Sequence, residues 1–215
     1  MIPLRDTIVS KNLPIVTVLL VLVNILVFVI QLGQAGEIHR FLFTYVLVPG
    51  RYSLPEMAVQ FSVWQQGLSL VSFMFLHGGI WHLAGNMWFL YIFGDKVEDA
   101  LGHFVFLFFY LACGILSGLS HMALNLESTV PVIGASGAVA GVMGAYLIRY
   151  PRARILTLVP VLFIPYFIEV PAAFFLGFWF LFQFISAVLF HSQGTGIAWW
   201  AHVGGFIVGM ALFKC

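Results

Sequence analysis

Long apolar stretches, separated by small clusters of charged residues or of Gly and Pro, dominate this sequence. A helix that crosses a bilayer needs about 20 mostly apolar residues. Dividing the chain at these clusters gives six candidate helices: 13–32, 82–94, 104–124, 136–150, 170–190 and 198–213. The second and fourth are short by this measure, and each is expected to start below the membrane surface. Charged residues form only 8% of the chain, whereas a soluble domain has roughly 25%. We therefore expect an all-α, multi-pass membrane protein with six transmembrane helices, forming a single domain over residues 1–215 in a lipid bilayer.

The basic residues predict the orientation of these helices, because Lys and Arg are retained in cytoplasmic loops. With the N-terminus in the cytoplasm, only Arg40 and Arg51 fall outside, and the other basic residues lie inside: Arg5, Lys11, Lys96, Arg149, Arg152, Arg154 and Lys214. An even number of spans places both termini in the cytoplasm. The segment 33–69 then forms an interfacial outer loop with short amphipathic helices. The apolar segment 155–168, interrupted by two prolines, is expected along the inner interface.

Three of the expected helices carry a polar side chain at a similar depth. Ser136, His202 and His82 each precede a charged residue at the inner end of their helix by twelve or thirteen positions. A rise of 1.5 Å per residue puts these side chains roughly 18–20 Å above the inner boundary. The three helices also run in the same direction, and Asn86 lies one turn from His82 on the same face. We expect these residues to share one layer, in a cavity that opens to the outer side.

Small residues at four-residue spacing predict which helices touch, because they let two helix backbones approach closely in lipid. The fourth and sixth expected helices carry such residues around the polar layer: Gly134, Gly137 and Gly141, and Gly205 and Gly209. This packing would bring the Ser136 hydroxyl within hydrogen-bond distance of the His202 imidazole. Each residue alone is explained more simply by packing or as a satisfied buried polar group. Their coincidence at one depth favours a functional site.

A serine with a neighbouring histidine predicts nucleophilic catalysis, because the imidazole can remove the hydroxyl proton. The oxyanion that forms on an attacked carbonyl needs preorganised donors. The backbone N–H of Ser136 at its helix start, the Asn86 amide and the His82 ring can supply them. No Asp or Glu is expected at this depth, so the site would be a dyad. What fixes the tautomer of His202 is not evident from the sequence.

Three motifs built on these residues resemble the rhomboid family of intramembrane serine proteases. They are Gly134-Ala-Ser136-Gly137, His82-Leu-Ala-Gly-Asn86, and Ala201-His202-Val-Gly-Gly205-Phe-Ile-Val-Gly209. The resemblance implies a six-helix rhomboid-like bundle, with Ser136 as nucleophile, His202 as general base, and His82 and Asn86 lining the oxyanion hole. Two features depart from the family. Ala140 stands where some members have a tyrosine that stacks on the catalytic histidine, and the Trp-Arg pair of the first outer loop is missing.

Bulky residues on the fifth expected helix have two interpretations. Phe174, Phe178 and Trp179 form a candidate lateral gate through which a substrate segment would enter, as the resemblance implies near this helix. A lipid-facing or packing surface explains them more simply. Gly194 and Gly196, before the sixth helix, would suit a mobile cap over the site, although a plain turn explains them equally well.

The leading hypothesis is an intramembrane serine endopeptidase that cleaves transmembrane segments of membrane proteins through an acyl-enzyme. Substrates with small or helix-weakening residues would be favoured, since the scissile backbone must leave its helix. We expect no cofactor and no metal, because the zinc-protease pattern His-Glu-x-x-His is missing, and no nucleic-acid partner, because the formal net charge is only +1. The alternatives are a transporter with a polar path, although no such path continues inward, and a non-catalytic binder of membrane segments.

Overall fold

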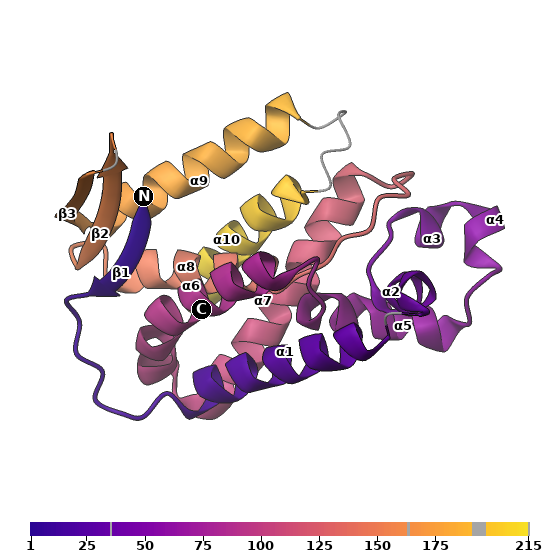
Figure 1. Cartoon of the computed structure of the whole chain (residues 1–215), viewed down its shortest axis with the longest axis horizontal. Coiled ribbons are helices and arrows are strands. Elements are labelled where there is room, and N and C mark those ends of the chain that lie inside the picture. Colours follow the sequence, from indigo (N-terminus) through magenta and orange to yellow (C-terminus); the bar gives the residue numbers. More distant parts are fainter. Residues whose placement is uncertain (35, 163, 191–196, 215) are drawn as a thin grey trace.

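The computed structural model describes residues 1–34, 36–162, 164–190 and 197–214, so Gly194 and Gly196 lie outside the described residues. It is mostly helical (Figure 1), with a helix at each of the six expected positions. These six helices are α1 (Ile15–Gly33), α6 (Ile80–Leu101), α7 (His103–Leu124), α8 (Ser136–Arg149), α9 (Ala172–Leu189) and α10 (Trp199–Lys214).

Several of these helices are long and apolar enough to cross a membrane. In the described part of the chain, α1, α7 and α9 meet this condition individually. A fourth span is added if α6 and the segment Val63–Phe75 before it, between which the chain bends by 78°, are counted as one bent span. Helices α8 and α10 contain only 14 and 16 residues, fewer than the roughly 20 of a full span. The chain is thus an integral membrane protein.

Helix α8 lies at the centre of the bundle. It packs against α6, α7, α9 and α10, and every residue from Gly137 to Tyr146 is buried. A helix that is apolar all round belongs in such a position, where protein rather than lipid surrounds it. The first residue of this helix, Ser136, is therefore held inside the protein.

Glycines set the distance between α8 and α10. A Cβ atom added to Gly209 would overlap the carbonyl oxygen of Gly141, and one added to Gly205 would overlap that of Gly137. On its other side, a Cβ at Gly141 would lie 2.6 Å from the Cys113 side chain on α7. The expected close approach of the fourth and sixth helices is thus present, and it requires the absence of side chains at these positions.

Replacing Gly209 with alanine is expected to destabilise the bundle, because the new methyl group must push α10 away from the α8 backbone. Overpacking of this kind costs about 1–3 kcal/mol, detected as a lower melting temperature of the purified protein in detergent. Gly177→Ala on α9 is the matched control, since nothing lies within 4 Å of a Cβ atom there. Equal melting temperatures of the two variants would contradict the close contact.

Helix α6 continues past the charged cluster at which the sequence predicts its end. It runs to Leu101 because its charged residues have partners. Glu98 accepts hydrogen bonds from the Val16 and Thr17 backbone N–H groups, at 2.8 and 2.7 Å, and from the Thr17 hydroxyl at 2.7 Å. The first N–H groups of a helix lack partners within it, and the N-cap residue of α1 provides no side-chain hydrogen bond. The Glu98 carboxylate therefore caps α1 and fixes it to α6.

The expectation of an all-α protein is wrong in one region. The segment 155–168 lies in a β-hairpin formed by β2 (Arg154–Val161) and β3 (Ile164–Pro171). The N-terminal strand β1 (Ile2–Asp6) pairs antiparallel with β2 to give a sheet of order β1-β2-β3. The two strands are rich in β-branched residues, and β3 also holds two aromatic residues, all of which favour strands. The two prolines of the segment face each other next to the turn, where a missing N–H is tolerated.

The N-terminal strand is fastened to the helices by side chains. Trp88 donates a hydrogen bond to the Pro3 carbonyl at 2.7 Å, and the Tyr146 hydroxyl donates one to the Asp6 carboxylate at 2.5 Å. Lys96 also lies 3.6 Å from that carboxylate. Burial raises the pKa of Asp6, while the hydrogen bond from Tyr146 and the charge of Lys96 act to lower it. These contacts connect β1 to α6 and α8.

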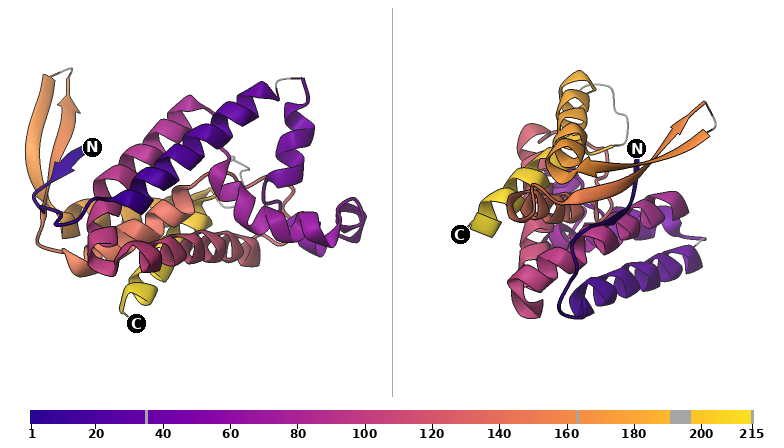
Figure 2. Two further views of the ribbon diagram at one scale, coloured as in Figure 1. Left: turned by 90° about the horizontal axis from the view of Figure 1, so that it is seen from below. Right: turned by 90° about the vertical axis from the view of Figure 1, so that its left-hand side faces the viewer.

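Four short helices lie at the opposite end of the bundle from the sheet (Figures 1 and 2). They are α2 (Ile38–Tyr45), α3 (Gly50–Ser53), α4 (Pro55–Ala58) and α5 (Val63–Ser72), followed by the 3₁₀ turn η1 (Phe73–Phe75). Buried Arg51 donates to the carbonyls of Phe43, Thr44 and Val46, and its guanidinium lies 3.6 Å from the centre of the Phe61 ring. The Arg51 side chain thus connects the end of α2 with the segment between α4 and α5.

Candidate active site

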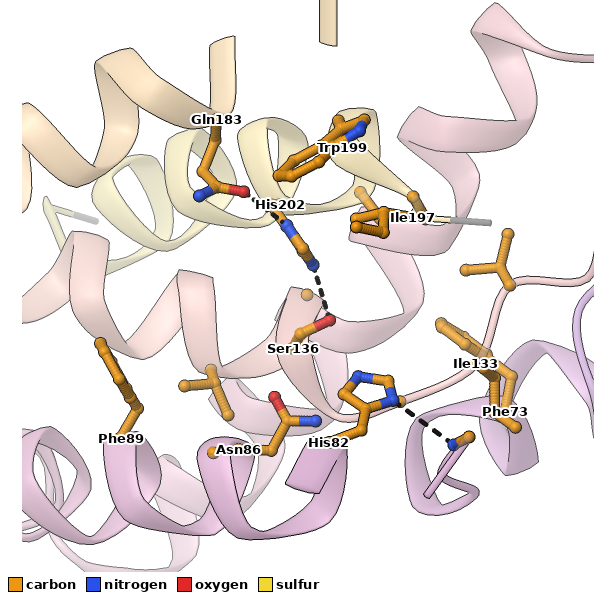
Figure 3. A pocket seen from close by; sticks show the side chains of 18 of the residues that line it. Phe73, His82, Asn86, Phe89, Ile133, Ser136, Gln183, Ile197, Trp199 and His202 are labelled. Atoms are coloured by element: carbon orange, nitrogen blue, oxygen red, sulfur yellow. Dashed lines mark hydrogen bonds between the residues drawn. The ribbon is translucent and has the colours of Figure 1, made fainter. Parts of the chain in front are cut away.

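A cavity of about 560 Å³ lies where α6, α8 and α10 begin (Figure 3). Its walls come from these three helices, from the segment before α8 and from α9. The polar side chains that the sequence places at one depth all line it: Ser136, His202, His82 and Asn86. Most of the remaining wall is glycine, aliphatic or aromatic. Such a mostly apolar cavity with a few convergent polar groups is typical of a binding site.

Ser136 and His202 form a hydrogen bond across the α8–α10 contact. The Ser136 Oγ lies 2.7 Å from His202 Nε2, and the other ring nitrogen, Nδ1, lies 2.8 Å from Oε1 of Gln183 on α9. The close approach of α8 and α10 places the serine and the histidine at this distance. The three side chains form a continuous chain of polar contacts (Figure 3).

Two tryptophans hold the His202 ring. Trp179 lies with its ring centre 6.2 Å away at an interplanar angle of 38°, and Trp199 meets the imidazole edge to face at 6.1 Å and 87°. Aromatic pairs prefer such offset and edge-to-face arrangements. Ala140 has no ring that could stack on the histidine, and the two tryptophans provide the aromatic contacts instead.

His82 and Asn86 face the serine from α6. The His82 Nδ1 accepts a hydrogen bond from the Gly78 backbone N–H at 3.4 Å, which leaves the proton on Nε2. The Asn86 side chain is only 8% exposed, and its Nδ2 has no hydrogen-bond partner in the described structure. A buried donor without a partner is costly, so this amide is preorganised to bind an acceptor that enters the cavity.

Gly134 is required by the shape of the turn before α8. Its φ of +116° disfavours any residue with a side chain, and a Cβ atom there would lie 2.6 Å from Cε1 of His82. The Gly134 backbone N–H donates to the Phe73 carbonyl at 2.9 Å. This glycine therefore lets the chain pass directly beside the His82 ring and enter α8 at Ser136.

The three candidate gate residues do not lie together. Phe174 and Phe178 are 74% and 63% exposed on the outer side of α9, and neither lines the cavity. Trp179 does line it. The phenylalanine that meets α6 is Phe175, which is buried with its ring centre 6.5 Å from that of Phe93.

Gln183 and Trp199 both contact His202 in the cavity, and neither is predicted as a site residue from the sequence. Gln183 interrupts the otherwise almost entirely apolar helix α9, and an isolated polar residue in such a helix is itself a signal of function. The depth comparison does not include Gln183, because α9 runs in the opposite direction to α6, α8 and α10. Trp199 carries no such signal. Its role depends on how α10 begins.

The fold and cavity define an integral membrane protein with a serine–histidine pair enclosed among its helices. The Rhomboid domain profile matches residues 61–215, and the chain belongs to the Rhomboid family. It is 29% identical over 198 residues to the mitochondrial Rhomboid protein 1 of Saccharomyces cerevisiae, a match that covers 88% of this chain and 50% of the yeast protein.

Other relatives match shorter stretches. The mitochondrial RHOMBOID-like protein 6 of Arabidopsis thaliana is 42% identical over 36% of this chain and 25% of its own length. The human mitochondrial presenilin-associated rhomboid-like protein is 30% identical over 43% of this chain and 24% of its own length. The matched region thus spans half or less of these curated relatives.

Proposed function

We propose that this protein is an intramembrane serine endopeptidase, organised as a single rhomboid-like protease domain over residues 1–215. The observation that carries the proposal is the 2.7 Å contact between Ser136 Oγ and His202 Nε2. This contact lies in a cavity that also presents the unpartnered amide of Asn86. A nucleophile, a base and a free donor in one cavity are the parts needed for acyl transfer.

The arrangement supports a two-step hydrolysis. Ser136 Oγ attacks the carbonyl carbon of the scissile peptide bond while His202 Nε2 takes the hydroxyl proton. The oxyanion is bound by the Ser136 backbone N–H and the side chains of Asn86 and His82. His202 then passes its proton to the leaving amine as the C–N bond breaks. A water attacks the acyl-enzyme, His202 takes one of its protons and returns it to Ser136 Oγ as the ester C–O bond breaks, and the product leaves as a carboxylic acid that then ionises.

A direct test is labelling by a fluorophosphonate, which phosphonylates activated serines with loss of fluoride. Purified protein in detergent should incorporate the probe at Ser136, identified by mass spectrometry of the modified peptide. Labelling should be lost in His202→Ala, because the hydroxyl then lacks its base. Modification of other serines with Ser136 left free would contradict the proposal.

We also propose that six helices cross the bilayer with both termini in the cytoplasm, so that the cavity opens to the outer side. The basic residues support this orientation, and the sheet that holds Arg5 and Arg154 lies at the opposite end from the short helices (Figure 2). Transmembrane segments with small or helix-weakening residues would be the substrates, since an extended backbone is needed next to Ser136.

Entry of the substrate between α6 and α9 can be tested at the candidate gate. A Phe174→Ala/Phe178→Ala variant is expected to change the cleavage rate of a transmembrane substrate in liposomes severalfold, because these two exposed side chains of α9 would meet the entering segment. Trp179 is left in place because it also contacts His202. Leu181→Ala is the control, since this residue is 52% exposed on α9 and does not line the cavity. If the Phe174→Ala/Phe178→Ala variant and the control cleave at the parent rate, the gate assignment is wrong.

A further inference from the structure

Gln183 occupies an environment that normally excludes an amide side chain. It lies on α9, a helix of high mean hydropathy, and is 6% exposed. Burying an amide without hydrogen bonds is unfavourable. Its Oε1 lies 2.8 Å from Nδ1 of His202, whose Nε2 contacts Ser136. The contact with His202 therefore gives this glutamine a specific partner.

We propose that Gln183 is a positioning residue that fixes the tautomer of His202, an inference that rests on the proposed protease function. An amide oxygen can only accept, so Nδ1 must carry the proton and donate it. Nε2 is then left with its lone pair directed at the Ser136 hydroxyl. This is the tautomer that a general base needs, and an aspartate usually selects it in serine proteases.

A neutral amide suits this position better than a carboxylate. An aspartate or glutamate would have to be buried as an anion in a site surrounded by apolar helices, which is costly. Gln183 supplies the same acceptor geometry without a net charge. Trp179 and Trp199 restrict the plane of the imidazole, and Gln183 selects which of its nitrogens faces the serine.

Three variants test the proposal with a transmembrane reporter substrate. Gln183→Met removes the acceptor at similar size, and kcat should fall by at least about 10- to 100-fold, the effect of losing the partner that orients a metal-binding histidine, with little change in KM. Gln183→Glu keeps the acceptor and should cleave at near the parent rate at high pH. Ser186→Ala, on the buried side of α9 one turn away, is the control and should match the parent.

The pH–rate profile separates orientation from a structural role. A carboxylate beside the imidazole favours the protonated ring, so the acidic limb should move to higher pH in Gln183→Glu, whereas Ser186→Ala should leave it in place. The titratable side chains that influence His202 from neighbouring helices are His82 on α6 and His121 on α7, and both are unchanged in these variants. A limb that moves as far in Ser186→Ala as in Gln183→Glu would contradict the proposal.

The tautomer can also be read directly from ¹⁵N NMR of histidine-labelled protein, with the His202 signals assigned by their loss in His202→Gln. Nδ1 should be the protonated nitrogen in the parent, and Gln183→Met should give a mixture. A proton on Nε2 in the parent would overturn the proposal. If the parent neither cleaves nor labels at Ser136, the protease function fails. If the parent is active and Gln183→Met retains its kcat, only the role of Gln183 fails.

Discussion

Ser136→Ala is expected to abolish cleavage of a transmembrane reporter substrate, with a loss of at least about 10⁴-fold, the scale on which serine proteases lose turnover without their nucleophile. His202→Ala should lose a similar factor, because the two side chains act as one unit through their 2.7 Å contact. Cleavage would be measured with purified protein in proteoliposomes. The double variant should be no slower than either single variant, since removing one partner already disables the other.

Ser117→Ala provides the matched control for this loss. Ser117 is another buried serine of the bundle, and its hydroxyl donates to the Gly114 carbonyl of its own helix at 2.7 Å. The substitution therefore removes a hydroxyl without touching the cavity, and cleavage should stay within severalfold of the parent. Undiminished cleavage in Ser136→Ala would exclude the mechanism. A variant that still binds the substrate but never cleaves it, together with an inactive parent, would instead favour a non-catalytic binder of membrane segments.

Asn86→Ala is expected to lower turnover by about 10²- to 10³-fold, the usual effect of removing one oxyanion donor. The physical reason is the unpartnered Asn86 Nδ2. In the resting protein it has no acceptor among the described residues, and it gains one only when a carbonyl oxygen becomes negative beside Ser136. Its stabilisation therefore appears in the transition state, so kcat should fall far more than KM rises.

Phe89→Leu is the control for Asn86→Ala, since Phe89 lines the same cavity one turn further along α6. It should change kcat only severalfold. The melting temperature of Asn86→Ala should not fall, because the amide nitrogen Nδ2 makes no hydrogen bond in the described structure whose loss would destabilise the protein. A fall in stability together with unchanged kcat would identify Asn86 as a structural residue.

The Gly-rich faces of the short helices α8 and α10 explain how Ser136 and His202 are held in a fixed position. Their backbones approach until side chains would overlap, so Ser136 and His202 are fixed by rigid helices rather than by loops. Catalytic groups need this precision, since a displacement of about 1 Å can cost 10²-fold in rate. Loss of stability in Gly209→Ala and loss of cleavage are therefore expected to occur together.

Much of the architecture follows from the sequence. Apolar length predicts where the helices lie, because lipid excludes charged side chains over most of a span. Counting residues inward from the charged boundaries predicts that Ser136, His202, His82 and Asn86 share a level, since the rise per residue of a helix is constant. Glycine spacing predicts the contact between α8 and α10. Each of these inferences uses a local, periodic property of the chain.

The features that the sequence did not reveal depend on contacts between distant segments. The strand β1 forms only because β2, about 150 residues away, offers it an edge. Helix α6 continues beyond its charged cluster because Glu98 accepts hydrogen bonds from the N-terminus of α1. Likewise, the tautomer of His202 depends on Gln183, which lies on a different helix. The periodicity of a sequence shows which residues share a face of one helix. The hydrogen-bond partner of a polar atom on that face depends on how the helices pack against each other.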